Sequence, residues 1–320
     1  MTTLASCGSP REDGVDQPDA QPDAQSTSGG LMPPGHGFQV MSSPIEIDPG
    51  TELTYCHYFR TSNTSDLTIK QWASHMTPGV HHMIVYLTPQ KLREPGTIEA
   101  DKCGLASIGT VGPIWTYSAQ DADHQFALPA DDGNGTPVGQ SIPAGQYGFI
   151  QVHYLNATDA RIQAHVELNA YAYDDGIQVT PAGPFVTLNT LIDLPPAASA
   201  LTPSTGMVNG SCNVSSDAKF YVMTTYTHKQ GVHTFVKDGA TTVFDSMNWA
   251  HPGTKEWSSS PFYSFTSGKL FYQCEYVNPN NYRIQYGDDT ATQEMCMAIG
   301  YYFPAIPGNG HFCLDSFMLN

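Results

Sequence analysis

Three histidines in the N-terminal half have the residue type and the setting of a metal site. His81 and His82 are adjacent and open an apolar stretch, and His153 lies in a second strand-like segment at 151–154. Neutral imidazoles suit copper in either oxidation state and also zinc. Adjacent residues on a regular strand face opposite ways, so both side chains reach one metal only if the backbone bends or bulges, as Gly79 would permit. An isolated His-His pair is more often structural, so its spacing alone does not assign a metal.

A second group of candidate ligands lies in the C-terminal half. Tyr226 and His228 are two residues apart on a predicted strand and therefore share one face, and Met295 lies far downstream, directly before Cys296. A thioether is a poor ligand for hard metals and a good one for Cu(I). A lone Met beside a Cys is more often core filler, so this group also needs wider context. His233 is an odd number of residues from His228 and would face away on a continuous strand, so a ligand role is not expected for it.

The elements that must position these side chains are predicted to be strands. The chain has 320 residues, including 29 Gly and 24 Pro, and apolar runs at helical spacing are scarce. Strand-like segments recur between the turn signals, for example at 149–154, 219–227 and 269–272. The chain is therefore predicted to be all-β, of the sandwich or jelly-roll type.

Composition also divides the chain into segments. The length suits two domains, and the Pro-rich stretch 180–184 interrupts the strand pattern, so we expect an N-terminal domain over 31–183 and a C-terminal domain over 184–320. Residues 1–30 contain no aromatic residue and repeat Gln-Pro-Asp-Ala, which is typical of a disordered tether. Within them, the setting of Cys7 resembles a bacterial lipoprotein processing site, where the Cys becomes lipidated. The alternative is that Cys7 is a chance free thiol.

The remaining cysteines and the net charge restrict the compartment and the partners. Six further cysteines are spread widely with no C-x-x-C pair, which favours disulfides in an oxidising compartment over a zinc site. The formal net charge is −17, and so acidic a surface repels nucleic acid. No run approaches the roughly 18 apolar residues of a membrane-spanning helix, so the expected membrane contact is through a lipid at Cys7 alone.

Taken in order, the short motifs resemble the copper type II ascorbate-dependent monooxygenases, the family of peptidylglycine α-hydroxylating monooxygenase and dopamine β-monooxygenase. Each motif is weak by itself, but the ordered set over residues 50–315 is specific. The motifs are His-His-Met at 81–83, Gln-Val-His-Tyr at 151–154, Thr-His at 227–228 followed by a Gly, and Glu-Met-Cys at 294–296 before Tyr-Tyr-Phe-Pro at 301–304.

This resemblance implies two tandem jelly-roll-like β-sandwich domains and a copper chemistry. A first copper on His81, His82 and His153 would store an electron. A second, oxygen-activating copper on His228 and Met295 would hydroxylate a C–H bond of an organic substrate, with dioxygen and an external reductant such as ascorbate. The resemblance also implies three disulfides: Cys56–Cys103, Cys212–Cys313 and Cys274–Cys296. The Cys274–Cys296 bond would help to hold the adjacent Met295 in place.

The sequence departs from the family at the second site, because Tyr226 replaces the first His of a His-x-His pair. A phenol is unionised at neutral pH unless a metal or cation lowers its pKa, and a phenolate favours Cu(II) over Cu(I). Tyr226 is therefore a ligand, a redox-active side chain or a packing residue. The second site accordingly binds copper through His228, Met295 and Tyr226 with altered chemistry, recruits His233 through the turn at Gly231, or is weak or empty. The chain would then hold one or two coppers.

The substrate contacts of the peptide-processing members are also replaced. Their carboxylate-binding Arg, Asn and Tyr correspond to Thr224, Met297 and Ile299, which offer one hydroxyl, so a peptidylglycine substrate is not expected. The leading hypothesis is a copper-dependent monooxygenase acting on an unidentified small or medium organic substrate, with Tyr226 and the two second-site ligands as catalytic residues. The alternative is a non-hydroxylating, surface-anchored copper-binding or electron-transfer protein. Either would be extracytoplasmic, in the periplasm or at the cell surface, lipid-anchored or secreted.

Overall fold

The computed structural model describes residues 30–77, 79–100, 103–104, 112–199, 201–306 and 310–319. Every regular element among them is a β-strand, so the predicted all-β class is confirmed. No helix in this part of the chain is long and apolar enough to cross a membrane. Cys7 and the remainder of the predicted tether up to residue 29 lie outside the described residues.

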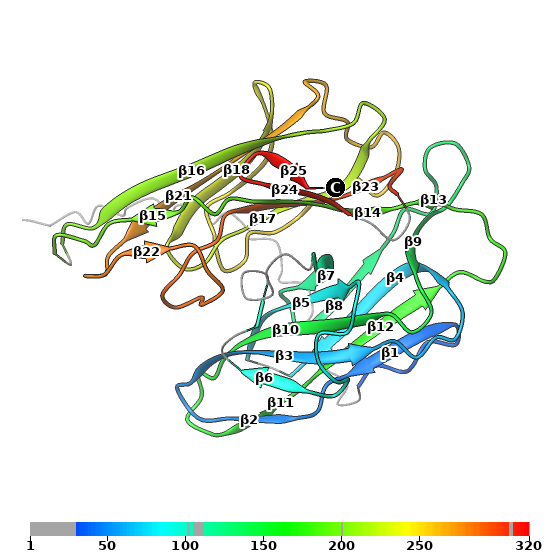
Figure 1. Cartoon of the computed structure of the whole chain (residues 1–320), viewed down its shortest axis with the longest axis horizontal. Helices are drawn as coiled ribbons and strands as arrows, with labels where there is room; N and C mark the ends of the chain where they lie inside the picture. Colours follow the sequence, from blue (N-terminus) through cyan, green and yellow to red (C-terminus); the bar gives the residue numbers. More distant parts are fainter. Residues whose placement is uncertain are drawn as a thin grey trace, which may run out of the picture. The chain divides into compact units, whose positions relative to one another are not determined.

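The strands from residue 37 to residue 181, here called the N-terminal strand set, form three sheets (Figure 1). The first has the order β1 (Gly37–Met41), β12 (Val166–Ala172), β4 (Leu67–Met76), β9 (Val138–Ile142) and β13 (Thr180–Pro181), and β8 (Asp123–Ala127) also pairs with β4. The second has the order β6 (Ile98–Ala100), β3 (Glu52–Arg60), β10 (Tyr147–Leu155), β5 (Val80–Thr88) and β7 (Ile114–Ala119). A two-stranded sheet joins β11 (Ile162–Ala164) to β2 (Ile45–Ile47).

The strands from residue 183 to residue 319, the C-terminal strand set, also form three sheets. The largest has the order β20 (Lys255–Glu256), β17 (Lys219–Tyr226), β23 (Met297–Phe303), β14 (Gly183–Leu188), β24 (His311–Leu314) and β25 (Phe317–Leu319). The second has the order β16 (Ser204–Asn213), β21 (Lys269–Asn278), β18 (Gly231–Asp238) and β19 (Thr241–Ser246). The third pairs β15 (Asp193–Leu194) with β22 (Ile284–Gln285).

No described strand of one set pairs with a strand of the other, but the two sets share a core. Every described strand pair lies within one set, yet residues 31–320 form one compact unit. The ring of Trp115 packs edge-on against Tyr226 at 5.9 Å, and Phe126 stacks on Tyr221 at 6.0 Å. One cluster of buried side chains draws on both sets, whereas a second belongs to the C-terminal set alone. The sets are therefore joined by apolar packing and by side-chain hydrogen bonds, such as that between Tyr226 and His82, rather than by strand pairing.

The three segments predicted as strands from sequence are confirmed as β10, β17 and β21. β10 lies between β3 and β5 in its sheet, and its side chains from Gly148 to Tyr154 are buried. That burial on both faces explains why its sequence is almost continuously apolar. In β21 buried and more exposed side chains alternate instead, as in a strand with one face on a core.

Three disulfides join the six cysteines of the described residues, and they are the pairs that the family resemblance implies. Cys56 is bonded to Cys103, Cys212 to Cys313, and Cys274 to Cys296. Disulfides persist where thiols are kept oxidised, so they indicate an extracytoplasmic environment.

Candidate metal centre

His81, His82 and His153 come together where two paired strands adjoin. The first two lie at the start of β5 and the third lies near the end of β10. One ring nitrogen of each histidine lies within 4.8 Å of those of the other two, and no other such cluster occurs in the part of the chain that the structure describes. The Nδ1 atoms of His81 and His82 are 3.0 Å apart. Nitrogens on one ion lie about 3 Å apart when each metal–nitrogen bond is about 2 Å long, so this spacing fits a shared metal.

A β-bulge explains how two adjacent side chains reach the same point. His153 pairs with His82 while the next residue, Tyr154, pairs with Val80, so His81 is an extra residue in β5. Such a bulge breaks the alternation of faces along the strand. Gly79 has a φ of +101°, a backbone conformation that favours glycine. The bulge expected near Gly79 is thus present, with His81 itself as the extra residue.

A hydrogen bond on the side of the His153 ring that faces away from the cluster determines which ring nitrogen carries the proton. His153 Nε2 donates to Glu52 Oε1 at 3.0 Å. Because an ionised carboxylate only accepts, this bond selects the tautomer with an unprotonated Nδ1. That Nδ1 is buried and has no hydrogen-bond partner. A buried lone pair left unpaired costs free energy, and a metal ion at the cluster would remove this cost, so His153 fits a metal ligand.

Burial keeps these imidazoles neutral and so ready to bind a cation. The pKa of His81 is lowered to about 4, first by burial and then by the neighbouring His153 and His251. Burial likewise lowers the pKa of His82 well below its ordinary value. For His153, burial lowers the pKa, while Glu52 opposes the shift. At neutral pH protons therefore do not compete for the ligand nitrogens.

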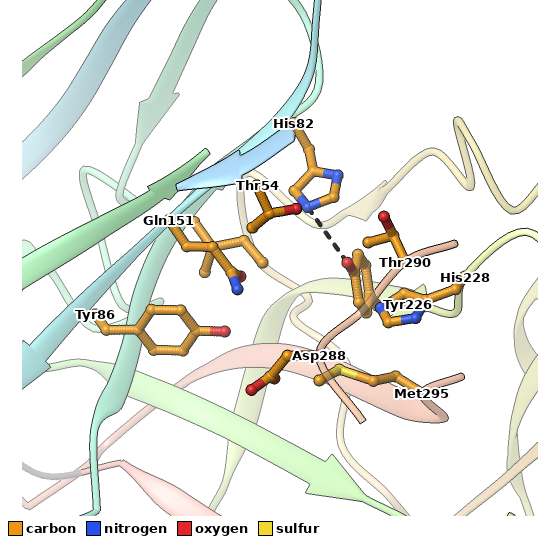
Figure 2. Close-up of a pocket in the computed structure, with 10 residues that line it drawn as sticks. Thr54, His82, Tyr86, Gln151, Tyr226, His228, Asp288, Thr290 and Met295 are labelled. Atoms are coloured by element: carbon orange, nitrogen blue, oxygen red, sulfur yellow. Dashed lines mark hydrogen bonds between the residues drawn. The ribbon is translucent and has the colours of Figure 1, made fainter. Parts of the chain in front are cut away.

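The second group of predicted residues lines a small cavity to which the first group contributes His82 (Figure 2). Tyr226, His228 and Met295 line it together with His82. The free space is enough for roughly one water molecule. The Nδ1–H of His228 donates to the carbonyl of Gln293 at 2.9 Å, which leaves its Nε2 unprotonated. An imidazole nitrogen and a thioether sulfur on one cavity form a ligand pair suited to Cu(I).

Tyr226 connects the two groups of candidate ligands. Its hydroxyl lies 3.3 Å from His82 Nε2, and its ring stands edge-on to the ring of His228 at 5.5 Å (Figure 2). Burial, and then the negative charges of Asp288 and Glu294, raise the pKa of this phenol far above its usual range. Without a metal ion beside it, the phenol therefore stays protonated and bonds to an outer nitrogen of the first cluster.

Glu294 fixes the backbone that carries the second group. Its carboxylate, which is fully buried, accepts backbone N–H bonds from His228 at 2.8 Å, Gln230 at 2.7 Å and Met295 at 3.2 Å. Burial raises its pKa to about 8, against the lowering effect of these N–H donors. Cys296 directly follows Met295, and its disulfide to Cys274 adds a covalent constraint on the backbone there. The positions of the two candidate ligands are thus set by bonds to one side chain and one disulfide.

His233 lies away from the second group. Its Nε2 bonds to Asp245 at 3.0 Å and its Nδ1 lies 3.5 Å from Glu275, and the two carboxylates raise its pKa. Two carboxylates directed at the ring nitrogens favour the protonated form of this imidazole. His233 is not among the residues that line the cavity of Tyr226, His228 and Met295.

Thr224, Met297 and Ile299 lie in different surroundings from the candidate ligands. Met297 and Ile299 are buried within the core shared by the two strand sets. The hydroxyl of Thr224 donates to the carbonyl of Gly253 at 2.6 Å. None of the three residues lines the cavity of Figure 2.

Several residues at the site have no signal in the sequence. Trp249 stacks on His81 at 5.1 Å, and the ring of His251 lies 6.0 Å from the same imidazole. The hydroxyl of Thr290 lies 3.3 Å from both Glu52 Oε1 and His153 Nε2. Spacing could not indicate these contacts, because each joins residues more than a hundred positions apart.

Comparison with models of known protein families finds none that matches this chain. The features that characterise the site are its geometry and its donor set. That set consists of three neutral imidazoles in one cluster, with an imidazole and a thioether on a cavity beside it.

Acidification is expected to destabilise the metal-free protein. The pKa of His81 and that of His228 are about 4 in the folded state, against 6.5 for an unperturbed imidazole. Between pH 6.5 and about 4 the unfolded chain therefore binds protons that the folded chain does not, and the free energy of unfolding falls as the pH falls. Glu294, with its raised pKa, acts in the opposite sense, but it is one group against several buried imidazoles.

The measurement is the thermal midpoint of the metal-free protein at pH 7 and pH 5. We expect a lower midpoint at pH 5, and a smaller drop in His81→Gln, which lacks one of the titrating imidazoles. A midpoint that is constant or rises on acidification would contradict the assignment of neutral, buried histidines.

Proposed function

We propose that this protein is a copper-dependent oxidoreductase of the monooxygenase type. The observation that carries the proposal is the cluster of His81, His82 and His153, with its three ligand nitrogens within 4.8 Å of one another. Their neutrality and the unpaired Nδ1 of His153 support the binding of a soft or borderline cation. Zinc fits the same nitrogens. Copper is favoured by the thioether of Met295 on the adjoining cavity.

Each group of residues has its own role in this proposal. His81, His82 and His153 hold the electron-storing copper, and His228 and Met295 hold the second. Copper bound there would supply the activation of dioxygen. The residues of the chain orient the ligand atoms, through Gln293 and the backbone bonds of Glu294, and they exclude bulk water from a cavity of about one water molecule.

The proposed partners are dioxygen, an external reductant such as ascorbate, and a small or medium organic substrate. The absence of a cation at Thr224, Met297 and Ile299 argues against a carboxylate-bearing peptide. Because the cavity has room for roughly one water molecule, an organic substrate would have to approach it from outside or separate the two groups. The disulfides support an extracytoplasmic setting, and a lipid anchor at Cys7 is part of the proposal.

The second candidate function is copper binding or electron transfer without hydroxylation. It is favoured by the contact of Tyr226 with His82, because the phenol here bonds to the first cluster where the family places a second-site ligand. A protonated phenol is a weak ligand, so the second group would bind copper weakly.

Copper content and oxygen consumption test these functions. The protein is loaded with copper, desalted and analysed for metal, and oxygen uptake is followed with ascorbate. Two coppers per chain with ascorbate-dependent oxygen uptake are expected for the oxidoreductase. One tightly held copper without turnover indicates the second candidate, and a gain of a second copper in Tyr226→His would strengthen that result. A chain that binds no copper contradicts both.

A further inference from the structure

Glu52 is a carboxylate at the edge of the histidine cluster that belongs to none of the sequence motifs. It is the first residue of β3, and it lies beside the end of β10, where it pairs with Leu155, two residues from His153. Its Oε1 accepts the Nε2–H of His153 at 3.0 Å. About a third of the Glu52 side chain is exposed, whereas His153 is almost fully buried. A partly hydrated carboxylate thus bonds to the outer nitrogen of the most buried cluster residue.

The bond has a chemical consequence for the inner nitrogen. With its proton held at Nε2, the His153 ring presents a lone pair at Nδ1, the buried atom that has no partner. Carboxylates bonded in this way to metal-ligating histidines fix the tautomer and the ring orientation, and they make the imidazole more basic. Glu52 therefore acts on the metal through His153 and is a positioning residue.

The negative charge of Glu52 also distinguishes the two oxidation states of copper. A nearby anion stabilises the doubly charged ion more than the singly charged ion, because the Coulomb energy is proportional to the charge. A more basic imidazole likewise favours the harder Cu(II). Both effects lower the reduction potential of the site.

Thr290 holds this carboxylate from the other strand set. Its hydroxyl donates to Glu52 Oε1 at 3.3 Å and lies at the same distance from His153 Nε2. Thr290 is itself buried, and it lies on the same cavity as Met295 (Figure 2). The loop before Met295 thus contacts the outer hydrogen bonds of the first cluster.

We propose that Glu52 is the positioning residue of the first copper site, that it sets the preference of this site for Cu(II) over Cu(I), and that Thr290 keeps it in place. The inference rests on the proposed function for the identity of the metal. Its structural part, the selection of one tautomer of His153, is a property of the metal-free chain.

The first experiment compares wild type with Glu52→Gln by competition against chelators specific for Cu(II) and for Cu(I). We expect the Cu(II) affinity to fall about 10–100-fold, as for mutation of an outer hydrogen-bond partner, and the Cu(I) affinity to fall much less. Each tenfold difference between the two affinities raises the reduction potential by about 59 mV, which voltammetry checks independently. Thr290→Val should change both quantities in the same direction and by less. Glu46→Gln, at a surface ion pair with Arg161, is the matched control and should change neither.

The second experiment needs no metal. Long-range ¹H–¹⁵N NMR spectra of the metal-free protein should show His153 protonated at Nε2 in wild type and a mixture of tautomers in Glu52→Gln, since an amide can donate or accept. Equal losses of Cu(II) and Cu(I) affinity, or an unchanged tautomer, would overturn the inference while leaving copper binding intact. If wild type bound no copper, the proposed function would fail and the oxidation-state preference with it.

Discussion

Replacing His153 with alanine is expected to lower the copper content of the loaded protein by one ion per chain. The cluster supplies three nitrogens within 4.8 Å, and two imidazoles alone leave a site open to chelators. Loss of an outer hydrogen-bond partner weakens metal binding about 10–100-fold, and loss of one of the three ligand imidazoles should weaken it more. Copper per chain after desalting, with and without a chelator, measures the effect.

His36→Ala is the matched control for this loss of one imidazole. His36 lies outside the cluster, and it has one long contact, of 3.8 Å, to the exposed Asp175. Its removal should leave the copper content unchanged. If His153→Ala kept full copper content against the chelator, the metal would have to be bound elsewhere, and the assignment of His81, His82 and His153 would be wrong.

Replacing Glu294 with leucine is expected to have the largest effect on stability. Three backbone N–H groups, of His228, Gln230 and Met295, would lose their acceptor inside the protein. Each buried donor left unpaired costs about 1–3 kcal/mol. Burying the carboxyl group itself costs free energy, as its pKa of about 8 indicates, so its removal offsets part of this loss. We therefore expect the free energy of unfolding to fall by about 2–4 kcal/mol. Urea unfolding of the metal-free protein measures it.

Two variants separate the role of the acceptor from that of the charge. Glu294→Gln keeps one side-chain oxygen as an acceptor and should lose less stability than the leucine variant. Glu256→Leu changes an exposed carboxylate and should lie within about 0.5 kcal/mol of wild type. If leucine at position 294 proved as stable as wild type, the backbone from His228 to Gln230 would not depend on this side chain.

The strands could be predicted because their signals are local. β10 and β17 stand out as runs of β-branched and aromatic residues between turn residues, and burial on both faces of β10 maintains that pattern. The first cluster was partly predictable for the same reason, since His81, His82 and His153 each lie in such a segment. What sequence left open was whether adjacent histidines could share a metal. The register shift at His81 answers that question, and its position depends on pairing with a strand about seventy residues away.

The rest of the site depends on contacts between the two strand sets, and no local sequence pattern predicts such contacts. Glu52 and Thr290 meet across 238 positions of sequence. Glu294 lies beside a recognisable Met-Cys pair, yet nothing local shows that its carboxylate would bond to the backbone of His228. Tyr226 and His228 were predicted to share one face of a strand, but β17 ends at Tyr226 and His228 lies in the connection to β18 that follows. The bond of Tyr226 to His82 depends on the packing of one strand set on the other.

The core shared by the two strand sets has a consequence for the order in which the chain can acquire its structure. Synthesis delivers the strands up to Pro181 first, and these include Trp115 and Phe126. Their ring partners Tyr226 and Tyr221 belong to a strand that is made later. A nascent chain that folds its first half early therefore displays aromatic surface to water until β17 has been made and packed against it. During this interval the exposed aromatic side chains favour aggregation.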